Sequence, residues 1–268
     1  MRTNNKDLPL DQFIEFALYD KDKGYYMKKN PFGKEGDFIT APNITRLFSE
    51  IIAIWVVTFW KSIGSPKKFN LVELGAGNGE MMKVIVETLK NFPECFLNCN
   101  FLIHEKSEFL KKKQQINLES EKITWIENIE ITNSFPTIFL ANEFFDALPI
   151  KQFFRKKEGW VERFVDLKEE EKAEFKEQST DIKIIEQKLN FEISKDQEII
   201  EYSPGSFEYL NNICNLIKKN DGGILIIDYG YLNFKMRETL QAINNHKFSS
   251  ILEDIGGDIS RALMAASE

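Results

Sequence analysis

The chain contains few of the residues from which metal sites and disulfide frameworks are built. Among its 268 residues there are three cysteines and two histidines. Cys95 and Cys99 are too far apart to form a CxxC pair, and the histidines add no cluster of ligands to them. We therefore expect no bound metal, and free thiols in a reducing compartment.

Long apolar runs and an excess of positive charge are also absent. The longest apolar run, residues 51–60, is about half the length that spans a bilayer. Several acids among the first twenty residues fit neither a secretory signal peptide nor a mitochondrial transit peptide. The formal net charge of −7 argues against nucleic-acid binding, which needs a basic face. We expect a soluble, cytoplasmic protein, and a mitochondrial location is disfavoured.

The rest of the sequence is organised around a glycine-rich stretch, FNLVELGAGNGE, at residues 69–80. Its pattern indicates a short apolar strand, a turn with glycines spaced GxGxG, and a helix over residues 81–90. Glycine lets the backbone approach a ligand closely and adopt positive φ. The helix start adds unpaired N–H groups beside the turn. The stretch therefore predicts a ligand-binding turn, although an ordinary tight turn between a strand and a helix is the alternative.

The acids around this turn favour one ligand over another. A dinucleotide-binding turn has a third glycine where this chain has Glu80, and an acid is a poor neighbour for a pyrophosphate. S-adenosyl-L-methionine (SAM) has no phosphate and carries two positive groups, so Glu73, two residues before the first glycine, suits it. The turn therefore favours SAM over a nicotinamide dinucleotide.

Predicted strands and helices alternate along the chain, which indicates a doubly wound α/β domain with a mostly parallel sheet. In such a sheet the ligand lies at the carboxyl ends of the strands. The glycine turn, residues 142–146 and Glu105 all fall at that edge, and an acid in the position of Glu105 binds ribose hydroxyls. The predicted strands lie near residues 69–74, 100–107, 123–127, 137–141 and 223–229, the last one fully buried.

The segments between these strands carry further patterns. Residues 20–42 are irregular, 151–166 alternate as a β-hairpin, and 168–181 are a solvated loop or frayed helix. The predicted helices cover residues 10–18, 43–60, 81–90, 109–118, 206–219 and 234–246.

Six blocks of sequence resemble one family, in the same order along the chain. They are GDFITAPNITRLFSEIIAIW (36–55), LVELGAGNGEMM (71–82), ANEFFDALPIKQF (141–153), WVERFV (160–165), EYSPG (201–205) and ILIIDYGY (224–231). The chain resembles the MidA-like family of SAM-dependent methyltransferases from about residue 10 to residue 258. The resemblance implies a Rossmann-like class I methyltransferase fold, SAM as cofactor, and methylation of a protein arginine linked to assembly of respiratory complex I, the NADH:quinone oxidoreductase.

The resemblance also implies how the chain divides. We expect an N-terminal helical and lid segment at residues 1–66 and a SAM-methyltransferase domain at 67–268, with a β-hairpin insertion at about 150–200. The family continues beyond the position of Ser260 with further strands. The residues after Tyr229 show no clear pair of strands, so we expect a truncated C-terminus.

Site residues follow by matching positions to the family. The predicted catalytic acids, which orient an arginine guanidinium, are Glu143, Asp146 and Glu201. Asp146 serves equally well as the cap of the following turn, whereas for Glu143 the functional role is favoured over that of a surface residue. The predicted cofactor-binding residues, the last three of them forming a lid, are Glu73, Gly75, Ala76, Gly77, Gly79, Glu105, Asn142, Asp37, Thr40 and Pro42.

Two other functions stay open. The first is a catalytically weak or inactive SAM-binding assembly factor, and the less favoured second is a nicotinamide-dependent oxidoreductase. The expected partner is an arginine-bearing protein such as a complex I subunit, and homodimer formation is open.

Overall fold

The computed structural model describes residues 7–28, 31–33, 36–38, 40–132, 134–167, 173–231, 235–244, 247–252 and 262–264. The chain groups into two compact units. The sheet unit contains Tyr26–Phe145 and Glu208–Asp228, and the hairpin unit contains Met1–Tyr25, Asp146–Phe207 and Tyr229–Glu268. The predicted division after residue 66 falls inside the sheet unit, because the helix that ends at Ser62 packs on the helix that follows the glycine turn.

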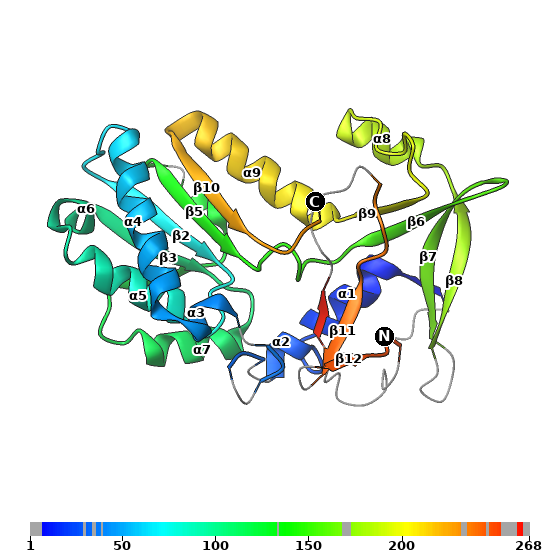
Figure 1. Cartoon of the computed structure of the whole chain (residues 1–268), viewed down its shortest axis with the longest axis horizontal. Helices are drawn as coiled ribbons and strands as arrows, with labels where there is room; N and C mark the ends of the chain where they lie inside the picture. The colour runs from blue at the N-terminus through cyan, green and yellow to red at the C-terminus, as the bar shows by residue number, and fades with distance from the viewer. Residues whose placement is uncertain are drawn as a thin grey trace. The chain divides into compact units, whose positions relative to one another are not determined.

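The sheet unit is built on a five-stranded parallel sheet of order β10-β5-β2-β3-β4 (Figure 1). The order reverses between β2 and β5, as in a doubly wound sheet, so the predicted sheet is confirmed. β10 pairs with one described strand, and Ile226 on it is 43% exposed, so the prediction of full burial was wrong. The strands are β2 (Phe69–Leu74), β3 (Cys99–His104), β4 (Ile123–Ile126), β5 (Thr137–Asn142) and β10 (Gly222–Ile227).

Helices cover both faces of this sheet. α4 (Arg46–Ser62) and α5 (Glu80–Leu89) pack against each other and share one apolar core with β2, which is buried at every residue. Ile103 of β3 belongs to this core. The next residue, His104, points to the opposite face, where its Nε2 lies 2.8 Å from the hydroxyl of Tyr209 on α9 (Pro204–Asn220). The remaining helices of the sheet unit are α6 (Pro93–Leu97), α7 (Glu108–Asn117) and the short 3₁₀ helix η1 (Ile129–Thr132).

The predicted single helix at 43–60 is two helices in the structure. α3 (Ala41–Ile44) ends at Thr45, whose backbone is extended with φ −149° and ψ 132°, and α4 begins at the next residue. The Thr45 hydroxyl accepts a hydrogen bond from the Leu47 N–H at 3.3 Å. Threonine is a preferred residue before a helix start because its oxygen accepts such a bond. The new helix start at Thr45 changes the chain direction beside the glycine turn.

The hairpin unit contains an antiparallel sheet of order β1-β7-β6-β9, with β8 paired to β7. The predicted hairpin is confirmed as β6 (Lys151–Lys156) and β7 (Gly159–Leu167). The prediction of a loop or frayed helix at 168–181 was wrong for β8 (Ala173–Thr180). The other elements are β1 (Asp7–Pro9), α1 (Leu10–Tyr19), α8 (Lys183–Leu189) and β9 (Ile199–Tyr202), while α2 (Tyr25–Lys28) begins at the boundary between the units.

The end of the chain forms strands where a helix was predicted. β11 (Gln241–Asn244) pairs antiparallel with β12 (Lys247–Ser249) and with β13 (Ala262–Met264). The predicted helix at 234–246 and the predicted lack of paired strands after Tyr229 were therefore wrong. Residues 234, 245 and 246 lie outside the described residues. These strands pair with each other rather than with the parallel sheet.

No helix in the described part of the chain is long and apolar enough to cross a membrane.

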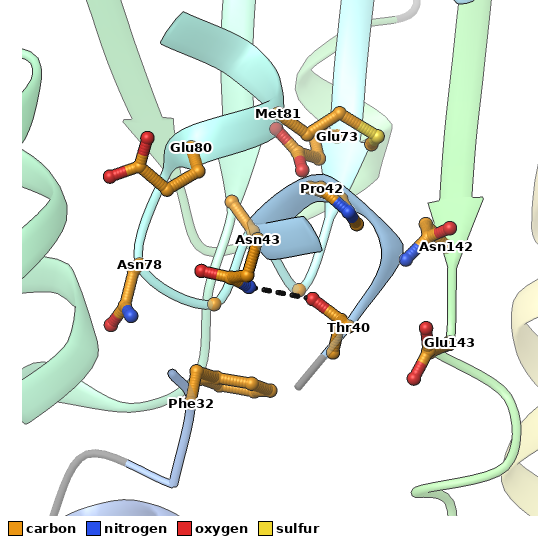
Figure 2. Close-up of a pocket in the computed structure, with 13 residues that line it drawn as sticks. Phe32, Thr40, Pro42, Asn43, Glu73, Asn78, Glu80, Met81, Asn142 and Glu143 are labelled. Atoms are coloured by element: carbon orange, nitrogen blue, oxygen red, sulfur yellow. Dashed lines mark hydrogen bonds between the residues drawn. The ribbon is translucent and has the colours of Figure 1, made fainter. Parts of the chain in front are cut away.

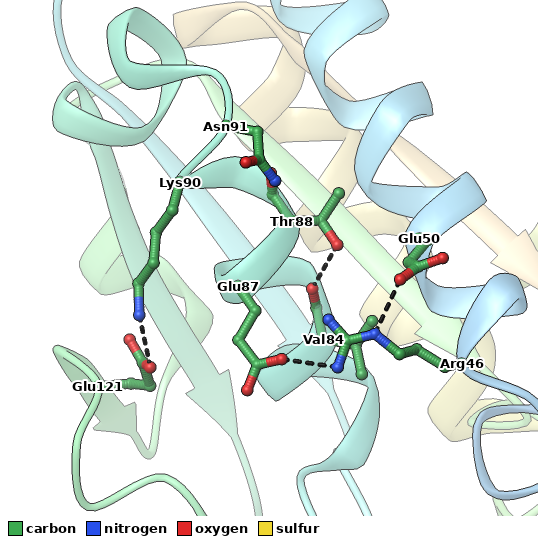
Figure 3. Close-up of polar contacts among 8 residues, drawn as sticks. All are labelled: Arg46, Glu50, Val84, Glu87, Thr88, Lys90, Asn91 and Glu121. Carbon is green, nitrogen blue, oxygen red and sulfur yellow. Dashed lines mark hydrogen bonds and ion pairs between the residues drawn. The ribbon is translucent and has the colours of Figure 1, made fainter.

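Two kinds of contact hold α4 in the sheet unit. Trp60 is 2% exposed, its ring centroid lies 6.2 Å from that of Phe69, and its indole N–H donates to the Pro66 carbonyl at 3.1 Å. At the surface, Arg46 forms ion pairs with Glu50 at 2.8 Å and with Glu87 of α5 at 2.7 Å (Figure 3). Exposed ion pairs stabilise proteins little, so the apolar contacts dominate.

We expect Trp60→Ala to lower the free energy of unfolding by about 3–5 kcal/mol, because it leaves a cavity and an unpaired carbonyl. Arg46→Ala should leave it nearly unchanged. Urea denaturation followed by circular dichroism measures both. Equal losses in the two variants would show that the ion pairs hold α4 as strongly as the buried indole does, and would contradict this account.

Candidate functional site

A cavity opens at the carboxyl ends of β2 and β5, where the strand order reverses (Figure 2). The space between its lining residues is ≈ 410 Å³, a volume that includes solvent at its open mouth. This is the edge at which the sequence places its site. The lining residues are Phe32, Thr40, Pro42, Asn43, Glu73, Gly75, Ala76, Gly77, Asn78, Glu80, Met81, Asn142 and Glu143.

The glycine turn forms the floor of the cavity with a backbone that only glycine adopts easily. Gly75 and Gly77 have φ of 65° and 54°. A Cβ at Gly75 would lie 2.9 Å from Cδ2 of Phe144, and one at Gly77 would lie 3.3 Å from the Phe32 ring. Gly79 precedes α5 with φ 83° and does not line the cavity. A side chain at Gly75 or Gly77 would therefore crowd the neighbouring aromatic ring.

Glu73, the last residue but one of β2, brings a buried carboxyl to the cavity. It is 3% exposed, and among the described residues its Oε2 has no hydrogen-bond partner. Burial, and after it the charge of Glu105, raises the pKa of Glu73 to about 8, and a hydrogen bond from the Met82 backbone opposes this rise. A positive ligand group at Oε2 would favour the ionised carboxylate.

Glu105 follows β3 directly and lies behind the turn, outside the cavity lining. Its Oε1 accepts from the Ser107 N–H at 2.8 Å and its Oε2 from the Gln114 amide at 2.9 Å. Burial raises the pKa of Glu105, and these two hydrogen bonds oppose the rise. The Gln114 amide also donates to the Gly77 carbonyl at 2.9 Å, which ties Glu105 to the turn.

The end of β5 contributes Asn142 and Glu143. The Asn142 Oδ1 is buried without a hydrogen-bond partner among the described residues. Glu143 has φ 50°, and its N–H donates to the Ile227 carbonyl at 2.8 Å. A residue other than glycine held in this region stores about 1–3 kcal/mol, and such strain gathers at functional sites.

The predicted lid reaches the cavity in part. Thr40 and Pro42 line it, and the Asn43 amide donates to the Thr40 hydroxyl at 2.7 Å (Figure 2). Asp37 is buried but is not a lining residue. Phe32 lines the cavity and was not predicted, although it lies in the irregular aromatic segment singled out in the sequence.

Two predicted catalytic residues, Asp146 and Glu201, belong to the hairpin unit. Glu201 accepts hydrogen bonds from the Gln152 amide at 2.6 Å and from the N–H of Thr239 at 2.9 Å, and its other oxygen accepts from the Thr239 hydroxyl. Asp146 is 5% exposed. The catalytic roles of both residues stay predictions.

The sequence predicted eight of the residues that line the cavity and missed five. Three of the missed residues lie in the glycine turn or the first two positions after it, one directly follows Pro42, and one lies five residues before Asp37. A rule that included every residue of the turn and the two residues after its last glycine would have found the first three. The missed residues are Asn78, Glu80, Met81, Asn43 and Phe32.

Within the described residues, no group of three or more histidine, cysteine, aspartate or glutamate side chains could hold a metal ion.

The fold and the cavity together define the class I methyltransferase architecture. The structure superposes on a likely methyl transferase from Burkholderia thailandensis, crystallised with S-adenosyl-homocysteine (SAH), with a TM-score of 0.81 over 98% of this chain and 70% of the other, at 19% identity. A second crystal structure from the same organism gives a TM-score of 0.77. The predicted fold class is confirmed.

The chain belongs to a family of putative SAM-dependent methyltransferases, whose model matches residues 51–261. Relatives named protein arginine methyltransferase NDUFAF7, mitochondrial, are 26% identical in Xenopus laevis, over 93% of this chain and 62% of the relative, and 27% identical in Homo sapiens, over 90% and 60%. The chain thus spans about three fifths of their length. SAM is the cofactor of the family, which confirms the predicted cofactor.

The residues at the cavity fit SAM. Glu73 Oε2 and Asn142 Oδ1 are buried acceptors without partners in the described chain, and a buried acceptor without a donor is costly. The ammonium group of SAM is a donor that could satisfy them. The turn without Cβ atoms leaves the backbone open to close approach.

The pKa of Glu73 predicts how stability depends on pH. Its folded value of about 8 lies above its ordinary value of 4.5, so between these pH values the folded protein binds more protons than the unfolded chain. This contribution to the stability of the ligand-free protein is full below about pH 4.5 and is lost as the pH rises towards 8. Glu73→Gln should flatten the decline in the free energy of unfolding between pH 5 and pH 8. The part due to Glu105, whose pKa is raised in the same direction, should persist.

Urea denaturation at several pH values measures this slope. Glu119→Gln, at an exposed acid of the sheet unit, is the control and should keep the parent slope. An unchanged slope in Glu73→Gln would show that its carboxyl is ionised in the folded protein well below pH 8.

The turn geometry predicts the effect of a side chain at Gly77. Gly77→Val should reduce SAH affinity at least tenfold, because a branched residue strains φ 54° and its Cβ crowds the Phe32 ring. Gly64→Val is the matched control, since Gly64 also has positive φ but has no atom within 4 Å of its Cβ position. Calorimetric titration with SAH compares the two. Equal affinity in both variants would contradict a cofactor seat on this turn.

Proposed function

We propose that this protein transfers a methyl group from SAM to an arginine nitrogen of a protein substrate. One observation carries the proposal: a carboxylate, Glu143, is held in a strained backbone at a cavity lined by the glycine turn. Membership of the family supports methyl transfer, and the names of the relatives support arginine as the acceptor. When bound, SAM supplies an electrophilic methyl group on a sulfonium sulfur.

The cofactor is held by acceptors at the strand ends. Glu73 and Asn142 receive the ammonium group at their unpartnered oxygens. Glu105, which follows β3, receives ribose hydroxyls, as an acid does in this position of related sheets. Glu80 stands where a dinucleotide-binding turn has its third glycine, and because an acid is a poor neighbour for a pyrophosphate, it disfavours a nicotinamide cofactor.

The acceptor arginine is oriented by Glu143. A guanidinium is positively charged at ordinary pH, so its nitrogens are poor nucleophiles. A carboxylate binds it through two parallel hydrogen bonds and fixes the plane of the group. Fixing the reacting nitrogen towards the methyl group lowers the barrier by positioning alone. The nitrogen that gains the methyl group must lose a proton, and the Glu143 carboxylate accepts it.

The acceptor protein is a subunit of the respiratory NADH:quinone oxidoreductase, and the reaction takes place in the cytoplasm. The six sequence blocks shared with the MidA-like family support the substrate, and the location stays a proposal. Mass spectrometry of the oxidoreductase subunits with and without this gene tests the assignment: an arginine methylated only when the gene is present is the expected result.

Glu143→Gln should reduce methyl transfer to an arginine peptide by about 10²–10³-fold, because the amide can neither pair with the guanidinium charge nor accept its proton. SAH affinity should stay within about threefold of the parent, since other residues hold the cofactor. Transfer of tritiated methyl groups and SAH calorimetry measure the two quantities.

Glu127→Gln, at an exposed acid of the same unit, is the control and should transfer methyl groups at the parent rate. Full activity of Glu143→Gln would exclude it as the guanidinium-binding carboxylate. Methylation confined to residues other than arginine would contradict the proposed acceptor.

A further inference from the structure

One buried amide joins two parts of the site that lie far apart in the sequence. Gln114 lies on α7, in a helix whose other polar side chains are mostly solvated, yet it is 0% exposed. Its Nε2 donates to the Gly77 carbonyl and to Glu105 Oε2, both at 2.9 Å. Its Oε1 accepts from the indole N–H of Trp125 on β4 at 2.8 Å.

These contacts fix the orientation of the amide. An indole N–H can only donate, so the oxygen of the Gln114 amide must face Trp125. The NH₂ group therefore faces the two acceptors, one hydrogen to each. Each polar atom of the side chain has its partner, and no rotation of the amide preserves all three hydrogen bonds.

Gln114 also compensates two partly buried acceptors at once. The Gly77 carbonyl belongs to the floor of the cavity, and Glu105 is a half-buried carboxylate behind the turn. Loss of the NH₂ group would leave both with one donor fewer in a place partly shielded from water, where an unsatisfied acceptor is costly. The hydrogen bond from Gln114 also lowers the pKa of Glu105 against the effect of burial, which favours the ionised acid.

We propose that Gln114 is a positioning residue for SAM, which acts by holding the Glu105 carboxylate and the Gly77 carbonyl at a fixed separation. Trp125 in turn holds Gln114. The inference rests on SAM binding at this cavity and on the ribose-binding role of Glu105 in the proposed function. It does not depend on which group accepts the methyl.

Gln114→Met tests the proposal, because methionine preserves the length and volume of the side chain and removes all three hydrogen bonds. We expect SAH affinity, measured by calorimetry, to fall at least tenfold, and adenosine affinity to fall by a similar factor because the ribose contact is affected. Gln115→Met is the matched control: the same change at the exposed neighbouring residue should stay within twofold. Parent-like SAH affinity in Gln114→Met would overturn the proposal.

Asn117→Leu separates the effect of bracing the glycine turn from the effect of linking the turn to Glu105. The Asn117 amide, one turn further along α7, donates to the Asn78 carbonyl at 2.9 Å and so braces the glycine turn, but within the described residues it forms no hydrogen bond with Glu105. We expect a loss below threefold. A loss equal to that of Gln114→Met would show that bracing the turn, rather than linking it to Glu105, is what matters.

A double-mutant cycle shows whether Gln114 acts through Glu105. In the Glu105→Ala background, Gln114→Met should cost no more than about threefold in SAH affinity, because the carboxylate that it positions is gone. A full tenfold loss in that background would overturn the proposal. If Gln114 only stabilised the fold, the losses of SAH affinity caused by Gln114→Met and Glu105→Ala would add in the double variant.

Trp125→Phe keeps the test valid if Gln114→Met does not fold. It removes one hydrogen bond and leaves an aromatic ring, and we expect a two- to fivefold loss of SAH affinity with a parent-like circular dichroism spectrum; no loss in this folded variant would count against the proposal. SAH binding needs no methyl acceptor. If the losses of SAH affinity at Gln114 and Glu105 are coupled but the parent protein methylates no arginine, only the proposed function is refuted. If the parent protein methylates arginine but the two losses are not coupled, only the role of Gln114 is refuted.

Discussion

The structure depends on keeping two carboxylates, the buried Glu73 and the half-buried Glu105, at one edge of the parallel sheet. Desolvation raises the pKa of both; the charge of Glu105 adds to the rise at Glu73, whose pKa is about 8, and the charge of Glu108 adds to the rise at Glu105. These acids oppose folding of the ligand-free chain as the pH rises. The surrounding groups offset part of that cost: the Ser107 N–H and the Gln114 amide at Glu105, and the Met82 N–H at Glu73. A cationic ligand with ribose hydroxyls would offset the rest.

The parallel sheet and its cavity could be predicted because both follow from local pattern. Each sheet strand is a short apolar run followed by a helical segment or a turn signal, and the rule for doubly wound sheets then places their carboxyl ends together. Gly75 and Gly77 were found by their spacing, and Asn142 and Glu143 by standing at the end of β5 and directly after it. Local signals suffice where neighbours in the chain make the contacts.

Elements stabilised by distant partners could not be predicted in this way. β8 has no apolar face that a sequence pattern could reveal. It is held by backbone pairing with β7 and by cross-strand contacts such as that of Lys176 with Asp166 at 2.7 Å. β11 pairs with residues about twenty positions further on, which no local window includes. Gln114 looked like part of a solvated basic helix, and only the packing of α7 against β4 and the turn buries it. Phe32 reaches Gly77 across more than forty residues.

Titration of the purified protein with SAM, SAH and NAD by calorimetry tests the central claim most directly, because Glu73 suits the positive groups of SAM and Glu80 disfavours a pyrophosphate. We expect SAM and SAH each to bind at one site per chain and NAD to give no saturable heat. Saturable binding of NAD, or no binding of SAM and SAH, would contradict the assignment of this cavity to SAM.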